Sequence, residues 1–252
     1  MESTNPLILN AEHHYALDQI EHLKGAIFLT GKAGTGKSTL IQLFRKTSAK
    51  RVIFLAPTGV AAVQIKGQTI HSFFRFPPQW ISSKDHRPIP RKLLEKTELI
   101  FIDEISMVRA DLLDHIDQVL QLSMGNKKVF GGIPMLWTGD LFQLPPVVRA
   151  DQEQNFLQSL YASPYFFSSK AFEKLEDFEL LELHQVFRQS EKYFISLLDK
   201  IRMNEADDDD LAAINAQLDP REKDQDEDVR INLTSTNMAS NQINSRRLEQ
   251  LN

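Results

Sequence analysis

Residues Gly31–Ser38 read GKAGTGKS and fit the pattern G-x-x-x-x-G-K-[ST]. Glycines at these positions let the backbone curl so that successive N–H groups point at phosphate oxygens, and a helix that begins at the end of the stretch adds its positive end. The apolar run Ala26–Thr30 precedes the stretch, and the amphipathic segment Thr39–Lys46 follows it. A strand, a glycine-rich loop and a helix in this order predict a P-loop that holds nucleotide phosphates.

Side-chain chemistry assigns roles within this loop. Lys37 is expected to reach the β- and γ-phosphates of ATP, and the Ser38 hydroxyl is expected to ligate Mg²⁺. A flexible glycine loop without a ligand is the alternative interpretation. The nucleotide-binding residues predicted here are Gly31, Ala33, Gly34, Thr35, Gly36, Lys37, Ser38 and Thr39.

Short apolar runs alternate with helical patterns along the chain, which predicts an α/β fold with a mostly parallel sheet and helices on both faces. In Ala110–Leu122, for example, the apolar residues recur at helical spacing. The expected strands are Ala26–Thr30, Val52–Ala56, Leu99–Ile102, Met135–Thr138, Leu180–Leu183 and Ile231–Thr234.

Two carboxylates follow the third expected strand, in the sequence LIFIDE at Leu99–Glu104. In P-loop enzymes an aspartate at such a place holds Mg²⁺. We therefore expect Asp103 to serve the metal and Glu104 to polarise the attacking water. Two solvated acids at the end of a surface strand are the alternative.

Composition is that of an ordinary globular protein, with 42% hydrophobic and 25% charged residues and a net charge of −5. Much of the acidity lies in Glu205–Asp210 and Glu222–Asp228, so charge neither implies nor excludes nucleic-acid binding. The chain has no cysteine, which excludes disulfides and cysteine zinc sites. We see no signal peptide or membrane span and expect an intracellular protein.

Two regions interrupt the alternation of strands and helices. Phe76–Arg91 is rich in proline and is read as an insertion that projects from the sheet. Residues 203–229 are polar, with a helix expected at Leu211–Leu218, an acidic helix start at Asp207–Asp210 and a linker at Arg221–Asp228. The strand and helix after the linker are too small to bury a core alone.

Several motifs in this order resemble the superfamily 1B DNA helicases, specifically the petite-integration-frequency (Pif) family and its relative RecD. The resemblance implies a RecA-like P-loop NTPase that uses ATP to move 5′ to 3′ on single-stranded DNA, with DNA repair, recombination and telomere maintenance as the processes served. The matching segments are Leu29–Ser38, Ala56–Ala62, Thr69–Phe73, Ile102–Met107, Gly139–Val147 and Val186–Gln189.

The resemblance also implies a division into domains. Residues 1–74 and 93–220 correspond to motor domain 1A, and residues 75–92 correspond to an inserted, wedge-like subdomain 1B. Residues 221–252 correspond to a linker and the start of a second RecA-like domain, 2A, whose later motifs have no counterpart here. We therefore expect a truncated motor.

Roles for individual residues follow from the same resemblance. Gln143 would sense the γ-phosphate of ATP and couple it to DNA, and Arg188 would contact the γ-phosphate; a structural salt bridge is the alternative for Arg188. The catalytic set is then Lys37, Asp103, Glu104, Gln143 and Arg188. Contacts to the DNA backbone are expected from Pro57, Thr58, Gly59, Thr69, His71, Ser72 and Phe73.

Aromatic residues near the insertion offer either base stacking or core packing. Core packing is expected for at least two of them, and base stacking remains open for the rest. These residues are Phe73, Phe74, Phe76 and Trp80. The partners implied are single-stranded DNA and duplex junctions, no membrane is implied, and a monomer is expected.

The chain departs from the family's pattern upstream of the P-loop. The family has an adenine-reading glutamine there, whereas this sequence has His13 or His14 at the matching place, and we include His14 among the nucleotide-binding residues. Two further functions stay open. One is a nucleotide-binding module with little turnover, and the other is a different P-loop ATPase, against which GDLFQLPPV at Gly139–Val147 argues.

Overall fold

The computed structural model describes residues 9–32, 34–78, 80–148, 151–185, 192–216, 232, 234 and 236–249. The chain divides into two compact units, residues 1–202 and 203–252. Residues 203–216 thus group with the second unit, whereas the sequence analysis placed them with the sheet. No helix among the described residues combines the length and the apolarity needed to cross a bilayer.

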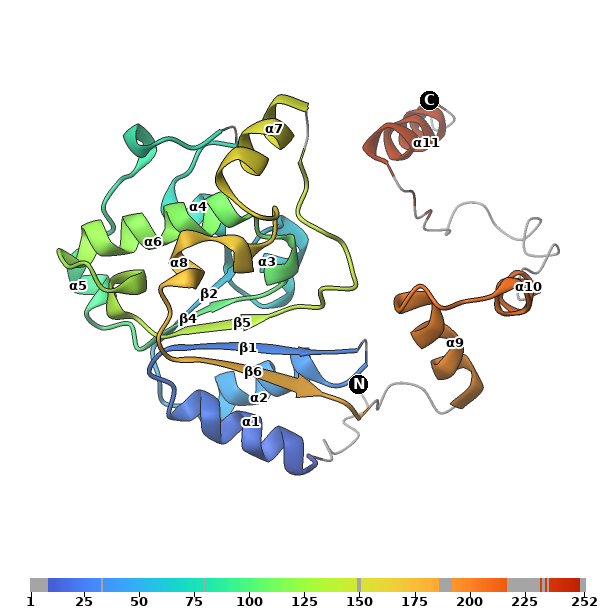
Figure 1. The fold of residues 1–252 in the computed structure, drawn as a ribbon, viewed down its shortest axis with the longest axis horizontal. Coiled ribbons are helices and arrows are strands. Elements are labelled where there is room, and N and C mark those ends of the chain that lie inside the picture. Colours follow the sequence, from blue (N-terminus) through green and yellow to red (C-terminus); the bar gives the residue numbers. More distant parts are fainter. Residues whose placement is uncertain are drawn as a thin grey trace. The chain divides into compact units, whose positions relative to one another are not determined.

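The first unit is built on a six-stranded sheet with the order β3-β2-β4-β5-β1-β6, and every pairing in it is parallel. This confirms the predicted α/β fold with a parallel sheet (Figure 1). The strands are β1 (Ala26–Gly31), β2 (Val52–Ala56), β3 (Gln68–Thr69), β4 (Leu99–Ile102), β5 (Met135–Thr138) and β6 (Phe178–Leu183). The two-residue β3 was not predicted. Of the expected strand at Ile231–Thr234, only Asn232 and Thr234 are among the described residues.

Helices connect the strands and are mostly short. In the first unit they are α1 (Ala11–Glu21), α2 (Lys37–Thr47), α3 (Gly59–Gln64), α4 (Ile70–Phe74), α5 (Arg91–Leu94), α6 (Ala110–Met124), α7 (Asp151–Leu160), α8 (Lys170–Glu173) and α9 (Lys192–Arg202). Single 3-10 turns lie at η1 (Ser83–Asp85), η2 (Ile105–Met107), η3 (Val129–Gly132) and η4 (Phe166–Ser168).

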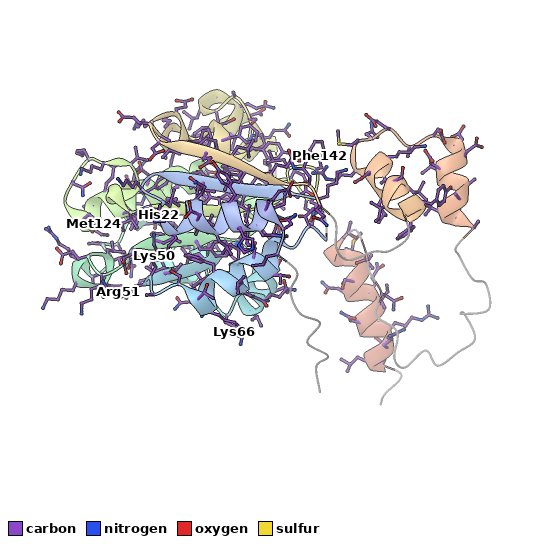
Figure 2. All side chains as sticks on the ribbon, turned by 90° about the horizontal axis from the view of Figure 1, so that it is seen from below. His22, Lys50, Arg51, Lys66, Met124 and Phe142 are labelled. Carbon is purple, nitrogen blue, oxygen red and sulfur yellow. The ribbon has the colours of Figure 1, made fainter. Side chains whose placement is uncertain are left out.

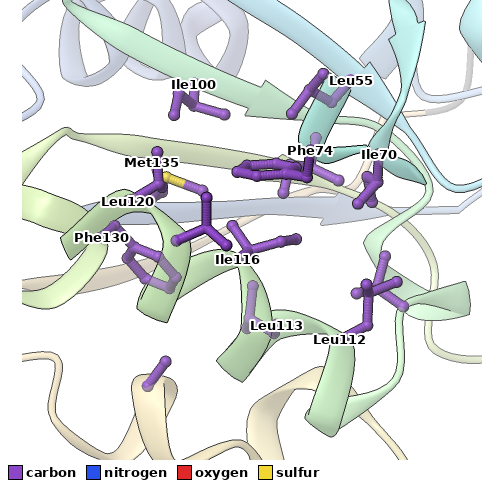
Figure 3. Close-up of a cluster of buried hydrophobic side chains, with 14 of the residues drawn as sticks. Leu55, Ile70, Phe74, Ile100, Leu112, Leu113, Ile116, Leu120, Phe130 and Met135 are labelled. Atoms are coloured by element: carbon purple, nitrogen blue, oxygen red, sulfur yellow. The ribbon is translucent and has the colours of Figure 1, made fainter. Parts of the chain in front are cut away.

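Alternate residues of each buried strand face opposite sides of the sheet, so the unit has two cores. In β1, Phe28 faces the core that includes α4, α6 and α8, and Ile27 faces the core that includes α1 and α2. Figure 3 shows part of the first core, where Leu113, Ile116 and Leu120 of α6 point toward the sheet. Both faces are covered, which is why the strands read as continuous apolar runs.

Among the described residues of the insertion that precede α5, which are 76–78 and 80–90, η1 is the only regular element, as the prolines predicted. However, Phe76, Ile81 and Ile89 are buried in the core shared with α6. The expectation that this segment projects away from the sheet is therefore wrong for its apolar side chains. A segment without regular structure can be buried when its backbone N–H and C=O groups find hydrogen-bond partners. Ile89 N–H, for instance, donates to Ser123 Oγ of α6 at 2.8 Å.

The second unit contains α10 (Asp208–Asn215) and α11 (Asn237–Glu249). Asp207 caps α10 and accepts a hydrogen bond from the backbone N–H of Asp210, and the Asp210 carboxylate accepts one in return from the Asp207 N–H. This capping box confirms the acidic helix start expected from the sequence. The helix begins at Asp208, earlier than the predicted Leu211. The predicted linker, Arg221–Asp228, lies outside the described residues.

Candidate nucleotide and DNA site

The loop Gly31–Ser38 joins β1 to α2 in a conformation that depends on glycine. Gly34 and Gly36 have φ of 83° and 88°, and Gly31 has φ of 145°. A side chain at Gly31 would place its Cβ 2.5 Å from the backbone oxygen of Leu183 in β6. The loop therefore keeps its shape only with glycine at these positions, and α2 begins at its end, as a phosphate-binding loop requires.

Lys37 opens α2 and turns back into the loop. Its Nζ donates to the backbone oxygens of Gly31 at 2.6 Å and Lys32 at 3.1 Å. Burial lowers the pKa of Lys37, and the carboxylates of Asp140 and Glu104 act against that shift. The ammonium thus sits in the concave side of the loop, where the sequence analysis expected it to meet phosphate. Ser38 and Thr39 follow it on the exposed side of the helix.

Asp103 and Glu104 stand directly after β4. The Thr138 hydroxyl, at the end of β5, donates to Asp103 Oδ1 at 2.5 Å, and the Glu104 N–H donates to the same oxygen at 3.1 Å. The hydroxyl of Ser38 and the carboxylate of Asp103 offer oxygen ligands, the kind that Mg²⁺ prefers, and their joint role at a metal stays a prediction.

Glu104 adopts a left-handed backbone conformation, with φ of 51° and ψ of 44°. This conformation costs a non-glycine residue about 1–3 kcal/mol. Burial raises the pKa of Glu104, and the neighbouring charge of Asp103 raises it further. A carboxylate with a raised pKa, turned out of the strand direction, is suited to accept a proton from water.

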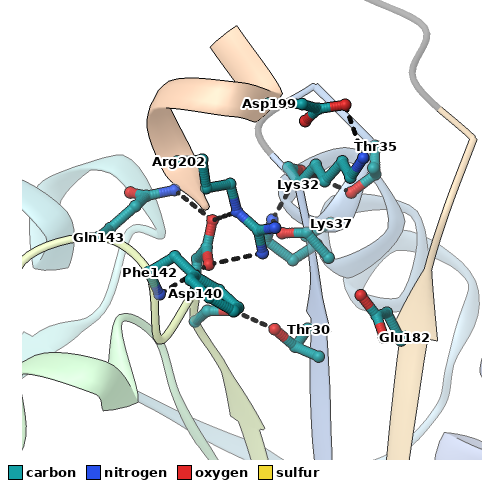
Figure 4. A network of polar contacts seen from close by, with 12 residues as sticks. Thr30, Lys32, Thr35, Lys37, Asp140, Phe142, Gln143, Glu182, Asp199 and Arg202 are labelled. Atoms are coloured by element: carbon teal, nitrogen blue, oxygen red, sulfur yellow. Dashed lines mark hydrogen bonds and ion pairs between the residues drawn. The ribbon is translucent and has the colours of Figure 1, made fainter. Parts of the chain in front are cut away.

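Asp140 and Gln143 lie in the loop that follows β5. Asp140 is 1% exposed, and its carboxylate accepts hydrogen bonds from the Phe142 N–H at 3.1 Å and from Gln143 Nε2 at 3.0 Å. Arg202 of α9 completes the set, with Nε 3.1 Å from Oδ2 and a terminal nitrogen 2.9 Å from Oδ1 (Figure 4). Burial alone raises the pKa of Asp140, but the hydrogen bonds from Arg202, Phe142 and Gln143 outweigh it and the pKa lies below its ordinary value.

These groups meet because of strand order. β4, β5 and β1 are neighbours in the sheet, and each ends in one of the three loops described above. The Thr30 hydroxyl of β1 donates to the backbone oxygen of Gly139 at 2.9 Å, which ties the β1 and β5 ends together. In Figure 2, Phe142 marks this carboxyl edge of the sheet, and Met124 marks the opposite end of the unit. Carboxyl edges of parallel sheets are where such folds bind ligands.

Of the two histidines upstream of the loop, His13 is the one that contacts it. His13 is 4% exposed; its Nδ1 accepts from the Asn10 N–H at 3.3 Å, so its Nε2 carries the proton and donates to the Thr35 backbone oxygen at 3.1 Å. His14 is exposed on α1. Its role toward adenine stays a prediction.

A groove of about 440 Å³ lies beside the ends of β2 and β3. Predicted DNA-contacting residues Pro57, Thr58 and His71 line it, together with Trp80. Thr58 and Thr69 cap α3 and α4 by accepting hydrogen bonds from Ala61 and Ser72 backbone N–H groups, which leaves the hydroxyl hydrogens to donate to a phosphate. Gly59 opens α3, and Ser72 and Phe73 lie within α4, the latter packed against the core.

Core packing accounts for at least two of the four aromatic residues near the insertion, as expected. Phe74 and Phe76 are buried and stack on each other with ring centroids 5.4 Å apart. Trp80, in contrast, is 36% exposed. The Arg109 guanidinium lies 5.1 Å from the Trp80 ring, and Phe156 of α7 meets the ring edge-on at 4.6 Å. Trp80 is therefore presented to the groove by neighbours on both sides.

Comparison with known proteins places this geometry in a family. The sequence profile described as PIF1-like helicase matches residues 8–211, more than half of the chain. The chain belongs to the PIF1-like helicase family. The family resemblance drawn from the motifs is thereby confirmed.

Individual relatives agree with the family assignment. The ATP-dependent DNA helicase PIF1 of Rattus norvegicus is 37% identical over 194 residues, which is 74% of this chain and 29% of that protein. The helicase RRM3 of Saccharomyces cerevisiae is 33% identical over 217 residues, 81% of this chain and 28% of that protein. The chain thus spans less than a third of these curated relatives.

Solved structures of PIF1-like helicases share the fold. Pif1 from Bacteroides in complex with ADP-AlF3 and single-stranded DNA has a TM-score of 0.88 and 35% identity, over 98% of this chain and 58% of that one. A structure described as two coordinating Pif1 helicases at forked duplex DNA has a TM-score of 0.75 and 38% identity, over 82% of this chain and 51% of that one.

Not every residue proposed from the PIF1-like motifs can be placed. Ala33 and Arg188 lie outside the described residues. Conversely, sequence reasoning gave no role to Asp140 or Arg202, and it named His13 only as an alternative to His14 toward adenine, although all three join the site. Asp140 comes just after Gly139, which follows the end of β5, much as Asp103 follows the end of β4, and this parallel was a usable signal. Arg202 carried no local signal, because it lies 62 residues from the carboxylate that it holds.

Proposed function

We propose that this chain is the N-terminal motor domain of an ATP-dependent DNA helicase, which binds ATP with Mg²⁺ and single-stranded DNA. The observation that carries the proposal is the convergence of Lys37, Asp103 and Gln143 on one sheet edge, next to a groove lined by Thr58, His71 and Trp80. The Bacteroides relative, whose structure contains ADP-AlF3 and single-stranded DNA, supports both ligands.

Each nucleotide-site residue has a role that its chemistry suits. The P-loop N–H groups and Lys37 hold the phosphates, and Ser38 and Asp103 hold Mg²⁺, which would neutralise phosphate charge when bound. Glu104 takes a proton from the attacking water, because its raised pKa makes it a better base than an ordinary carboxylate. Gln143 donates to the γ-phosphate, and Arg188 is proposed as a second cation there.

DNA is proposed to bind along the groove beside β2 and β3. The hydroxyls of Thr58 and Thr69 and the imidazole of His71 would contact phosphates, which fixes the strand without reading its sequence. Pro57, Gly59, Ser72 and Phe73 complete the proposed DNA contacts, the backbone N–H groups serving where side chains cannot. Residues 75–92 are proposed to form the wedge at duplex junctions, and movement 5′ to 3′ is carried over from the family resemblance.

A nucleotide-binding module with little turnover is the second candidate. Superfamily 1 motors close a second RecA-like domain over the nucleotide, and this chain spans less than a third of its curated relatives. Without such a second domain, Gly31–Ser38 would still bind ATP, yet hydrolysis would be slow, because the transition state would lack the groups that the second domain supplies.

Single-turnover ATP hydrolysis, measured with and without a single-stranded oligonucleotide, decides between the two candidates. Strong stimulation of ATP hydrolysis by DNA supports the motor and contradicts the slow module. Nucleotide binding with slow, DNA-independent hydrolysis supports the slow module and contradicts the motor. Tight nucleotide binding with no affinity for single-stranded DNA at low salt contradicts the motor.

Further properties are proposed with the motor. We expect Mg²⁺ to be required, a monomer in solution and an intracellular location. Titration with EDTA tests the metal, light scattering tests the oligomeric state, and microscopy of a fluorescent fusion tests the location. Partial duplexes that carry a single-stranded tail at the 5′ or the 3′ end test the direction of movement, since only the 5′-tailed duplex should be unwound.

A further inference from the structure

The carboxylate of Asp140 is the centre of a small network at the nucleotide edge. It accepts from the Gln143 side chain, from the Phe142 backbone and from two nitrogens of Arg202, all between 2.9 and 3.1 Å. Both of its oxygens therefore have two donors each. Gln143 cannot change its position without losing a charge-assisted hydrogen bond to this carboxylate.

Arg202 is well placed to hold that carboxylate. Its side chain is 15% exposed and that of Asp140 is 2% exposed, so solvent screens the pair weakly. The guanidinium also lies 4.2 Å from the centre of the Phe142 ring, in the same loop. A forked hydrogen bond and a stacking contact fix the loop in two directions, and arginine alone among side chains supplies both.

The helix that carries Arg202 has a second connection to the nucleotide site. Asp199, one turn earlier in α9, accepts from Lys32 of the P-loop at 2.6 Å. Residues three apart share a helix face. One face of α9 therefore holds both the P-loop and the loop after β5 (Figure 4).

We propose that Arg202 is a positioning residue, which acts through Asp140 to set Gln143 against the γ-phosphate of ATP. The inference deepens the proposed function and rests on it for the role of Gln143. Arg202 donates a forked pair of hydrogen bonds to Asp140 and stacks on Phe142, and its proposed effect on phosphate runs through these contacts. A shift of α9 would therefore change the position of Gln143, the residue proposed to sense the γ-phosphate.

The test is discrimination between ATPγS and ADP, measured as the ratio of their dissociation constants by calorimetry. Arg202→Gln, Asp140→Asn and Gln143→Ala should each lower the preference for ATPγS about tenfold and leave the ADP affinity unchanged. The double variant Arg202→Gln/Gln143→Ala should lose no more than Gln143→Ala alone. Arg202→Lys should lose the preference as Arg202→Gln does, because an ammonium cannot donate two parallel hydrogen bonds to the Asp140 carboxylate.

Arg91→Gln is the matched control. It removes an arginine–carboxylate pair of similar length, 2.9 Å to Glu95, on the exposed surface of α5, and it should leave the preference unchanged. The unchanged ADP affinity of each variant shows that its P-loop is folded.

Four outcomes would overturn the inference. The first is a wild-type preference for ATPγS over ADP in Arg202→Gln, and the second is a wild-type preference in Arg202→Lys. The third is a loss in Arg202→Gln without a loss in Asp140→Asn, which indicates direct contact between Arg202 and phosphate. The fourth is a double variant that loses the product of both single effects. A failure of the proposed function looks different, since wild-type protein would then bind neither nucleotide.

Discussion

The ammonium of Lys37 donates a hydrogen bond of 2.6 Å to the backbone oxygen of Gly31, inside the loop that carries it. The contact keeps the charge in the curve of the loop, where phosphate oxygens can replace the carbonyls as acceptors. Lys37→Ala should therefore weaken ATPγS binding and lower any hydrolysis by about 100-fold. Lys46→Ala, at the exposed end of the same helix, is the control. Wild-type hydrolysis by Lys37→Ala protein would refute the site.

Glu104 combines a raised pKa with a place beside Asp103, which predicts a pH-dependent role in hydrolysis. Glu104→Gln should preserve nucleotide binding and slow single-turnover hydrolysis by about 10²–10⁴-fold. In the wild type the rate should fall as pH drops through the raised pKa of Glu104, because the protonated carboxyl group is no base. The variant should lack this fall.

Glu98→Gln, at an exposed residue just before β4, is the matched control for Glu104. It should keep both the rate and its pH dependence. Loss of nucleotide binding by a folded Glu104→Gln protein would contradict the assignment of Glu104 to the hydrolysis step.

His13 braces the P-loop through the Thr35 backbone oxygen. Removing the imidazole leaves this buried acceptor without its donor, which costs about 1–3 kcal/mol. His13→Ala should therefore weaken ADP and ATPγS binding alike, by about tenfold, in calorimetry. His13→Gln, which offers both a donor and an acceptor, should retain most of the affinity.

His14 tests a separate prediction, that a histidine here reads adenine. His14→Ala should lower the preference for ATP over GTP in competition binding and leave the shared phosphate affinity unchanged. If His14→Ala is silent and His13→Ala alters the preference, the adenine role belongs to His13.

Local patterns in the sequence were enough to predict the strands that end in the site, because each is a short apolar run that is buried on both faces. They were not enough for β3, since two residues carry no periodicity. The buried insertion was missed for a related reason: Phe76, Ile81 and Ile89 follow no regular spacing, and only their distant partners show that they belong to a core.

The site divides in the same way. Lys37 and Asp103 are recognisable because their neighbours in sequence create their environment. The pair of Asp140 and Arg202 depends on how α9 returns to the sheet, and the contact of His13 with Thr35 depends on how α1 packs beside α2. Pairings between distant segments are products of the fold, so no local window contains them.

Trp80 presents its ring to the groove between Arg109 and Phe156, which predicts that it stacks on a base. Trp80→Ala should weaken binding of a fluorescent oligothymidylate about tenfold, since one stacked base contributes about 1–3 kcal/mol. Trp80→Phe should retain most of the affinity. Tyr15→Ala, an exposed aromatic residue of α1, is the control. Equal affinity of Trp80→Ala and wild type would remove Trp80 from the DNA site.

His86 of the insertion and His115 of α6 are hydrogen-bonded, with Nε2 and Nδ1 2.8 Å apart. Burial lowers the pKa of both groups, and for His115 the charge of His86 lowers it further, against the opposing charges of Asp111 and Asp114. Asp85 acts in the opposing direction on His86. Both rings also lie near Phe76, with ring centroids 6.2–6.4 Å away. Two neutral imidazoles thus join the insertion to α6.

Acid should weaken this junction, because the folded pKa values lie below that of an unfolded histidine, about 6.5. Above that pH both histidines are neutral in the folded and in the unfolded state, so their titration does not change the free energy of unfolding. As pH falls through 6.5 toward the folded values, the unfolded chain takes up protons first, so stability is lost. When the pH is lowered from 7.5 to 5.5, the melting temperature of the wild type should decrease by about 2 °C or more beyond the decrease seen for His115→Asn. His22→Asn, at an exposed histidine, should follow the wild type; if His115→Asn does so too, the pair is not the source.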